Sequence, residues 1–284
     1  MKKYTNIGEL LIDFREYTNL SQADLAALLD IDARTVQRWE KNITLVKPEK
    51  EVELVEATYL PRQLVRNLNS TEPIPTYFDF KLRKYSLSAL DKGLPSFKDI
   101  KNRIVLEPER LHTIQAPDEL DKILRYVRHQ YHPNYHLKSA FVEQAIRLLP
   151  DINLFLADVS GYYAGHSLIF SLTREAFEQI CKREMALSDL SSEHLTNYLQ
   201  EKKPHFLAYS VTADSNDGVY FLLSKIFDFF EKLPQDEHRY GTFTSRYDSV
   251  AQNQEINLKP VWEESLKNET TKQVDTYRFY EGLI

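Results

Sequence analysis

The stretch from Leu20 to Asn42, LSQADLAALLDIDARTVQRWEKN, constrains the local secondary structure more than any other part of the sequence. Ser21 is followed three residues later by Asp24, which is the spacing of a capping box at a helix N-terminus. Apolar residues then recur at helical spacing until Asp30, a residue type that tolerates the positive φ of a tight turn better than most. The pattern predicts two short helices joined by a turn that contains neither Gly nor Pro.

The second predicted helix begins after Asp32, whose side chain is suited to cap it. Val36 and Trp39 fall three residues apart on one face, so we expect them to point into a core. The other face then carries four polar side chains in close succession: Arg34, Thr35, Gln37 and Arg38. A preceding helix is predicted from the apolar positions Ile7, Leu10, Leu11 and Phe14.

These two helices resemble the DNA-binding helix-turn-helix of the lambda-repressor and Cro-like family, whose usual pattern runs Leu-Ser-Gln, Leu-Ala, a turn, and a helix that ends in Trp-Glu. The resemblance implies that Gln22 opens the second helix of the module against a DNA phosphate. It also implies a structural pair between Arg15 and Glu40. Arg can fork onto guanine and Gln can form two bonds with adenine, so the polar face is apt for base readout. The residues implied to reach the major groove are Arg34, Thr35, Gln37 and Arg38.

The module departs from the family pattern in its charge. Asp30 stands in the turn where Gly is usual, and Asp32 stands where Ser or Thr commonly touches phosphate. Residues 1–50 contain five Lys and three Arg against four Asp and four Glu, so their net charge is zero. Phosphate attraction is therefore weak, tight binding needs several half-sites or a dimer, and we expect a homodimer. The alternative is a helical module that binds only protein or no longer binds DNA.

The composition of the whole chain limits where such a protein acts. The net charge of −6 means that any nucleic-acid contact must be local. Hydrophobic residues make up 42% and aromatic residues 12%, enough for a substantial core in roughly two domains. No apolar run approaches the ~18 residues of a membrane span, and MKKYTNIGEL lacks the apolar core of a signal peptide. The lone Cys181 fits a reducing compartment, so we expect a cytoplasmic protein without a membrane partner.

Changes of texture along the chain set the expected domain boundaries. Helical spacing continues beyond Lys47, with Pro61 near a helix start, which predicts a helix-turn-helix domain at residues 1–69. Residues 70–103 contain prolines and little periodicity, which predicts a linker or extended arm. Helical and strand patterns mix in residues 104–284, which predicts an α/β domain with a mostly antiparallel sheet. The expected fold class is an all-α domain followed by an α/β domain.

The order of elements in residues 104–284 carries a second resemblance. Two amphipathic helices precede a hairpin with strands at 154–159 and 163–172. The strand HFLAYSVTA, the loop DSNDG, the apolar helix VYFLLSKIFDFFEKL and three more strand patterns follow. This order is similar to that of the GNAT acetyltransferases. In that family the strand before the long helix splays, and the next loop cradles the pyrophosphate of acetyl-CoA on backbone N–H groups at the helix N-terminus.

The loop that corresponds to the phosphate cradle departs from the family. It keeps one glycine, lacks a basic residue, and places Asp214 and Asp217 where two phosphates would lie. The two aspartates would repel the phosphates, so we expect no cofactor. Acetyl-CoA is a possible ligand on the strength of the resemblance alone. Glu255 falls where a Tyr acid is frequent in the family. The positions implied to touch an acyl-CoA are Val211, Ser215, Asn216, Gly218, Val219 and Tyr220.

Other groupings of reactive side chains are weaker. His129, His132 and His136 have a spacing that suggests a metal, but His132-Pro133 ends the helix and no Cys or acid cluster joins them. We therefore expect a polar helix end and no metal site. His166 follows Gly165 as in central strands of the GNAT family, and it is either strand filler or a general base. No residue receives a catalytic role from the sequence.

Two functions of different classes remain open. The first is a sequence-specific DNA-binding transcriptional regulator whose GNAT-like domain senses a ligand or mediates dimerisation. The second is an acyl-CoA-dependent N-acyltransferase that its helix-turn-helix guides to DNA or to a protein substrate. The loop from Asp214 to Gly218 discriminates between them, because an intact phosphate cradle favours the enzyme. The expected partners are double-stranded DNA and, for the second domain, a small-molecule or acyl-CoA ligand.

Overall fold

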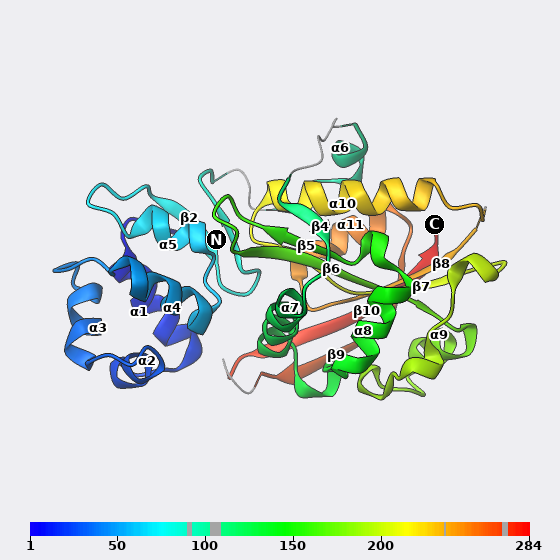
Figure 1. The fold of residues 1–284 in the computed structure, drawn as a ribbon, viewed down its shortest axis with the longest axis horizontal. Coiled ribbons are helices and arrows are strands. Elements are labelled where there is room, and N and C mark those ends of the chain that lie inside the picture. Colours follow the sequence, from blue (N-terminus) through cyan, green and yellow to red (C-terminus); the bar gives the residue numbers. More distant parts are fainter. Residues whose placement is uncertain (90–92, 103–108, 236, 269–271) are drawn as a thin grey trace. The chain divides into compact units, whose positions relative to one another are not determined.

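The computed structural model describes residues 1–89, 93–102, 109–235, 237–268 and 272–284, and the chain forms two compact units. The first unit is built on Met1–Lys92 and the second on Gly93–Ala213, Asp217–Asn268 and Val274–Ile284. Figure 1 shows the first unit in blue and cyan and the second in green to red. No helix in the described ranges is long and apolar enough to cross a bilayer.

Cap and turn residues place the helices of the first unit. Ser21 Oγ accepts a hydrogen bond from the Asp24 N–H at 3.1 Å, and the Asp24 carboxylate accepts one from the Ser21 N–H at 2.8 Å, so the predicted capping box is confirmed. Asp30 has a φ of 48°, as expected for the turn, and Asp32 Oδ1 accepts from the Arg34 N–H at 2.7 Å. The resulting helices are α1 (Ile7–Thr18), α2 (Gln22–Leu28), α3 (Ala33–Glu40), α4 (Pro48–Thr58) and α5 (Arg62–Leu68).

Gly8 allows α1 to lie against the end of α3. A Cβ atom at this position would come within 2.4 Å of the Glu40 carbonyl oxygen and 2.9 Å of Asn42 Nδ2. The Gly8 N–H itself donates to Asn42 Oδ1 at 3.2 Å. Only a residue without a side chain permits so close an approach. The two helices thereby bury Leu10, Val36 and Trp39 in one apolar core.

The segment predicted as a linker or arm, residues 70–103, instead adds two strands to the first unit. β2 (Thr76–Asp79) pairs antiparallel with both β1 (Lys2–Tyr4) and β3 (Lys84–Ser86). Phe78 on β2 is 2% exposed and lies in the same core as α1 and α3. The linker expectation fails at residues 76–86 because strands of three or four residues show too little periodicity to be seen beside two prolines. Later in the same segment α6 (Phe97–Asn102) belongs to the second unit.

The second unit is a sheet with helices on its faces. Its strands are β4 (Leu111–Thr113), β5 (Leu154–Ala157), β6 (Tyr163–Leu172), β7 (His205–Ala213), β8 (Arg239–Thr244), β9 (Lys259–Lys267) and β10 (Val274–Leu283). In addition to α6, its described helices are α7 (Pro117–Gln130), α8 (Ser139–Leu148), α9 (Arg174–Cys181), α10 (Asn216–Glu231) and α11 (Val250–Glu255). The hairpin predicted at 154–172 and the strand predicted at 205–213 are both confirmed.

The seven strands lie in the order β4-β5-β6-β7-β8-β10-β9. Every neighbouring pair in this order is antiparallel except β7 and β8, which run parallel because α10 carries the chain back between them. The predicted fold class, a helical region followed by a GNAT-like α/β domain with a mostly antiparallel sheet, is therefore confirmed.

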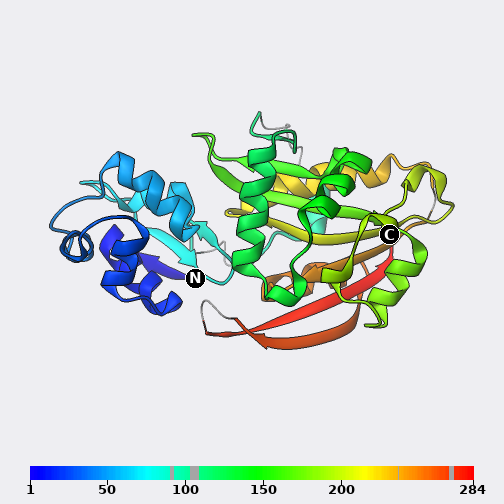
Figure 2. The ribbon, with the colours of Figure 1, turned by 60° about the horizontal axis from the view of Figure 1, so that its bottom comes forward.

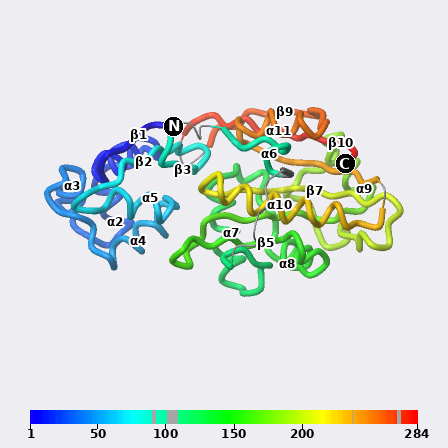
Figure 3. Tube along the Cα trace, turned by 90° about the horizontal axis from the view of Figure 1, so that it is seen from above, coloured from blue at the N-terminus to red at the C-terminus, as the bar shows by residue number. Residues whose placement is uncertain are grey.

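Aromatic side chains fill the space between the sheet and its helices. On one face Phe206 of β7 packs edge-on against Phe230 of α10, with ring centroids 5.1 Å apart. On the other face Phe170 of β6 meets Phe141 of α8 at 5.1 Å. The sheet thus lies between α10 on one side and α7 to α9 on the other, and Figure 3 shows α10 from above.

Two buried histidines make the stability of the second unit depend on pH. His238 is 5% exposed, stacks on Phe230 at 4.9 Å, and has no hydrogen-bond partner for either ring nitrogen among the described residues. Burial lowers the pKa of His238 below the usual 6.5, and burial together with Arg239 lowers the pKa of His205. The unfolded chain therefore binds protons first as the pH falls through 6.5, and the native state loses stability.

We expect the free energy of unfolding, measured by urea melts of the second unit, to decrease from pH 7 to pH 5. The slope is at most about 1.4 kcal/mol per pH unit for each histidine. His238→Phe keeps the stacking and removes one titrating group, so its profile should be flatter than that of the wild type. An unchanged profile in this variant would assign the pH dependence to other groups.

Candidate functional site

A buried carboxylate ties the first three helices of the first unit together. The Glu40 side chain, 5% exposed, accepts two hydrogen bonds from Arg15, at 2.5 Å from Nε and 3.1 Å from Nη2. It accepts a third from Gln22 Nε2 at 2.6 Å. Arg15 also donates to the Leu20 carbonyl at 3.1 Å, which links the end of α1 to the start of α2. The Arg15–Glu40 pair implied by the sequence is present, and the Gln22 contact adds to it.

The outward face of α3 carries the residues predicted to contact DNA. Arg34, Gln37 and Arg38 are exposed, whereas Val36 is fully buried and Trp39 is 3% exposed. Thr35 and Gln22 are half-buried. Gln22 is the first residue of α2, and Glu40 accepts from one of the two N–H groups of its side-chain amide. The structure therefore brings the predicted residues onto α2 and α3 of one unit.

Acidic side chains accompany this face. Asp30 and Asp32 are exposed at the turn between α2 and α3. Hydrogen bonds from Ser21 lower the pKa of the Asp24 carboxylate, so a third negative charge persists at the start of α2. Lys41, which follows α3, is exposed and supplies a further positive charge near its end. We did not single out Lys41 from the sequence, although the sequence places it directly after the second predicted helix.

In the second unit, β7 and β8 pair only at their first residues. The parallel register joins His205–Ala208 to Arg239–Thr242 and ends there, although β7 continues to Ala213. The β6–β7 register shifts at the same place and leaves Tyr209 as the extra residue of a bulge. A bulge bends its strand, so β7 parts from β8 beyond Ala208. This is the splay that the resemblance to acetyltransferases implies.

Polar side chains form a hydrogen-bonded chain at this splay. Tyr163 Oη lies 2.6 Å from His166 Nδ1, and His166 Nε2 lies 2.9 Å from Ser210 Oγ. The Tyr131 hydroxyl donates to Ser210 Oγ at 3.3 Å and to the Tyr209 carbonyl at 3.4 Å. Burial raises the pKa of Tyr131 to about 12, so its hydroxyl stays protonated. His166 is fully buried and both of its ring nitrogens are engaged, which fixes its orientation.

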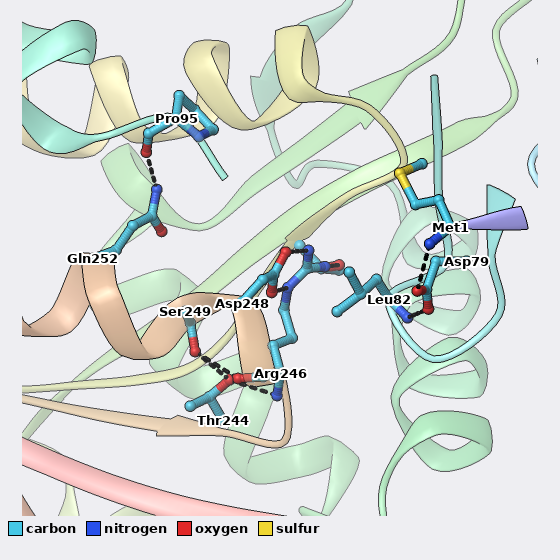
Figure 4. Close-up of polar contacts among 10 residues, drawn as sticks. Met1, Asp79, Leu82, Pro95, Thr244, Arg246, Asp248, Ser249 and Gln252 are labelled. Atoms are coloured by element: carbon cyan, nitrogen blue, oxygen red, sulfur yellow. Dashed lines mark hydrogen bonds and ion pairs between the residues drawn. The ribbon is translucent and has the colours of Figure 1, made fainter. Parts of the chain in front are cut away.

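An arginine bridges the parted strands. Arg246, which follows β8, donates to Thr212 Oγ1 of β7 at 3.3 Å. Asp248 accepts from two nitrogens of the same guanidinium at 3.0 and 2.9 Å (Figure 4). Although burial opposes the charge, the Asp248 carboxylate raises the pKa of Arg246. A side-chain hydrogen bond from Arg246, whose charge Asp248 balances, therefore crosses the splay where backbone pairing has stopped.

The residues predicted to hold an acyl-CoA lie at the end of β7 and on the first turns of α10. Gly218 and Val219 are buried, and Asp217 is exposed beside them. Asp214 is 3% exposed, and Asp214–Asn216 groups with the first unit rather than the second. Val211, Ser215, Asn216 and Tyr220 are half-buried. The helix N-terminus that would face a pyrophosphate is therefore present, with one acidic side chain before it and one in its first turn.

The surroundings of Glu255, Cys181 and His136 disfavour a reactive role for these side chains. The Glu255 carboxylate accepts from the Phe97 N–H at 2.6 Å, so it is bound to the start of α6. Burial raises the pKa of Cys181, at the end of α9, to about 11, which disfavours a thiolate. His136 Nε2 contacts the Tyr131 carbonyl at 2.8 Å. The described ranges contain no group of three or more His, Cys, Asp or Glu side chains that could hold a metal ion.

Several N-acetyltransferases are among the solved structures that are similar to this chain. They include a mosquito arylalkylamine N-acetyltransferase like 5b, a polyamine N-acetyltransferase of Drosophila melanogaster, and a ribosomal-protein-alanine N-acetyltransferase of Brucella melitensis. Their identities to this chain are 10%, 6% and 10%, and their TM-scores are 0.37, 0.40 and 0.33. Each similarity covers 61% of this chain and 99% of the other. At these values the similarities carry no statement about activity.

No protein-family model and no curated protein matches the sequence. The GNAT-like description of the second unit therefore rests on its own topology: the strand order, the single parallel pair among the described strands, and the splay at Tyr209.

The buried carboxylate of Glu40 generates a test of the first unit. Glu40→Ala leaves the Arg15 guanidinium and the Gln22 amide without their partner, so we expect a loss of about 3–5 kcal/mol in the free energy of unfolding. Trp39 fluorescence in a Trp262→Phe background reports on this unit alone. Glu16→Ala, an exposed glutamate on α1, is the matched control and should change stability by less than about 0.5 kcal/mol. Equal effects of the two variants would contradict the structural role of Glu40.

Proposed function

We propose that this chain is a sequence-specific transcriptional regulator that binds double-stranded DNA through α2 and α3, with the GNAT-like unit as a sensor or dimerisation domain. The observation that supports this is the buried Glu40 carboxylate, which fixes α1, α2 and the end of α3 to one another. Buried contacts fix α3 on its inner side, and Arg34, Gln37 and Arg38 are exposed on its outer side. The exposed side of α2 and α3 is thus a rigid platform, which suits base readout because binding then costs little additional ordering of the protein.

Each polar side chain of the platform has a distinct task in this proposal. Arg34 and Gln37 lie three residues apart and so share a helix face, from which they read base edges in the major groove. Thr35 and Arg38 flank them and contact the neighbouring base or phosphate. Gln22 offers its second amide N–H to a phosphate while Glu40 holds the first.

The electrostatics of the platform support a modest affinity for each copy. Asp30 and Asp32 are exposed beside Arg34, so the local field attracts phosphate less than a purely basic face does. Specificity then comes from hydrogen bonds to bases, and affinity comes from joining two copies on adjacent half-sites.

The second candidate is an N-acyltransferase, which the splay between β7 and β8 favours. In that case His166 is the group placed to accept a proton, since its Nε2 lies 2.9 Å from Ser210 Oγ at the parted strand. Two observations rank this candidate second. Arg246, paired with Asp248, bonds Thr212 across the splay. Asp214 and Asp217 bracket the start of α10.

Variants of α3 test the leading proposal. Replacing Arg34 or Gln37 by Ala should cost on the order of 1–3 kcal/mol of discrimination at one base position, because each change removes one bidentate contact. The measurement is selection of binding sites from random double-stranded DNA, followed by titration of the selected site by fluorescence anisotropy. Both variants should melt like the wild type, since neither side chain is buried.

Two further variants complete the design. Arg147→Ala removes an arginine of α8 whose side chain is 74% exposed, and it should leave the selected sequence unchanged. Val36→Asp buries an unpaired charge and should unfold the first unit. The proposal fails if the wild type enriches no sequence, or if the Ala variants at positions 34 and 37 enrich the same sequence equally well.

Calorimetry with acetyl-CoA tests the second candidate. We expect binding weaker than the low micromolar range or no binding, because Asp214 and Asp217 repel the phosphates and no basic residue stands in the loop. Asp217→Asn removes the exposed one of these charges and should bind acetyl-CoA more tightly than the wild type does. A wild-type dissociation constant in the low micromolar range or below would move the enzyme to first place.

A further inference from the structure

The seven-stranded sheet ends in a long strand with an open edge. β9 spans Lys259–Lys267, and in the described sheet it pairs with β10 alone. Every second residue from Val261 onward is exposed. Figure 2 shows β9 along the lower border of the sheet. The opposite edge strand, β4, is only three residues long. The edge of β9 is therefore a row of backbone donors and acceptors that another extended chain can join.

The regular part of this edge is short and well defined. A register shift in the β9–β10 pairing leaves Val261 without an opposite residue, and Pro260 before it cannot donate a backbone hydrogen bond. From Trp262 to Lys267 the register is continuous, facing Phe279 to Val274. Glu263, Ser265 and Lys267 lie on one face of this segment, because strand residues alternate between faces.

We propose that this edge pairs antiparallel with the same edge of a second copy of the chain, centred on Ser265. The inference rests on the proposed function, for which it names the dimer surface. Pairing about a two-fold axis places each residue opposite its mirror position, so Glu263 of each copy faces Lys267 of the other. Two opposite-charge pairs then flank a central pair of serines.

Charge selects this register over the others. The two-fold axis passes between the two copies of one residue, and side chains opposed across it lie on the same face of the joined sheet. Each residue of the regular segment could therefore be the central one, and each choice gives a different register. A centre at Glu263 or at Glu264 sets two glutamates against each other, and like charges directly opposite destabilise a sheet. A centre at Leu266 pairs no opposite charges. Within the regular segment from Trp262 to Lys267, only the centre at Ser265 makes the edge complementary to itself.

The contacts already present on β9 are compatible with this arrangement. Ser265 Oγ lies 3.1 Å from Thr276 Oγ1 of β10, and Arg278 bonds Glu263 at 2.7 Å on the same face. The Glu263 side chain is still 59% exposed, so it can meet Lys267 of a second copy as well. A two-fold pairing uses the β9 edge once in each copy, and the other described edge of this sheet is the short β4, so the sheet closes as a dimer.

Charge variants test the register. Light scattering coupled to size exclusion at micromolar concentrations should give a dimer for the wild type. Lys267→Glu sets Glu against Glu twice and should weaken the dimer by about tenfold or more. The double variant Glu263→Lys with Lys267→Glu exchanges the two charges and should restore dimerisation, although each single change weakens it. Thermal melts confirm that the variants are folded.

Cross-linking locates the axis. In a Cys181→Ser background, Ser265→Cys places two thiols directly opposite each other across the axis, within about 1 Å of the Cβ separation of a disulfide, and oxidation should produce a covalent dimer. Lys259→Cys is exposed on the same strand but off the axis, and it should cross-link far less.

A monomeric wild type would overturn the inference, and so would a dimer that ignores both charge variants or one that cross-links equally from positions 259 and 265. Failure here is separable from failure of the proposed function. A monomer that still enriches one DNA sequence sinks the β9 interface and leaves DNA binding in place, whereas a β9-linked dimer that enriches none does the reverse.

Discussion

The buried carboxylate of Glu40 is the constraint on which the first unit depends. A charge with 5% of its side chain exposed is costly unless every part of it is paired, and here three hydrogen bonds pair it. Those bonds come from two helices, so the carboxylate can be satisfied only when α1, α2 and the end of α3 are in place together. Gly8 completes this arrangement, since no side chain fits between α1 and the Glu40 carbonyl. The exposed face of α3 is thus set by a contact on its opposite side.

The second unit depends on a constraint of another kind, the extra residue at Tyr209. A bulge there ends the pairing of β7 with β8, so beyond Ala208 the backbone of β7 has a strand neighbour on its β6 side alone. The chain compensates with side chains: the Tyr131 hydroxyl bonds the Tyr209 carbonyl, and Arg246 reaches Thr212 across the gap. These contacts satisfy polar groups of β7 where its backbone pairing with β8 has stopped.

Local signals made much of this fold predictable from the sequence. The capping box at Ser21, the φ of Asp30 and the strand at 205–213 each depend on a few neighbouring residues, and each is confirmed. β2 and β3 escaped prediction because each strand is very short, and because one partner of β2, Lys2–Tyr4, is distant in the sequence. The exposed positions of α3 followed from helical periodicity. The bond from Gln22 to Glu40 did not, because it depends on how two helices pack.

In the proposed regulator, the lack of net positive charge in the first unit makes a dimer necessary, and the β9 edge of the second unit would provide it. Residues 1–50 contain as many acidic as basic residues and would release few counterions, so in this proposal one copy alone would bind DNA weakly and with a shallow dependence on salt. Two copies joined at β9 present two such faces, and the second contact then forms at the high effective concentration that a physical link provides. Avidity of this kind can reach about 10²–10⁴ without any new contact to DNA. Because each face is weak, a single half-site holds the protein poorly, and specificity comes to depend on the spacing of two half-sites as well as on their bases.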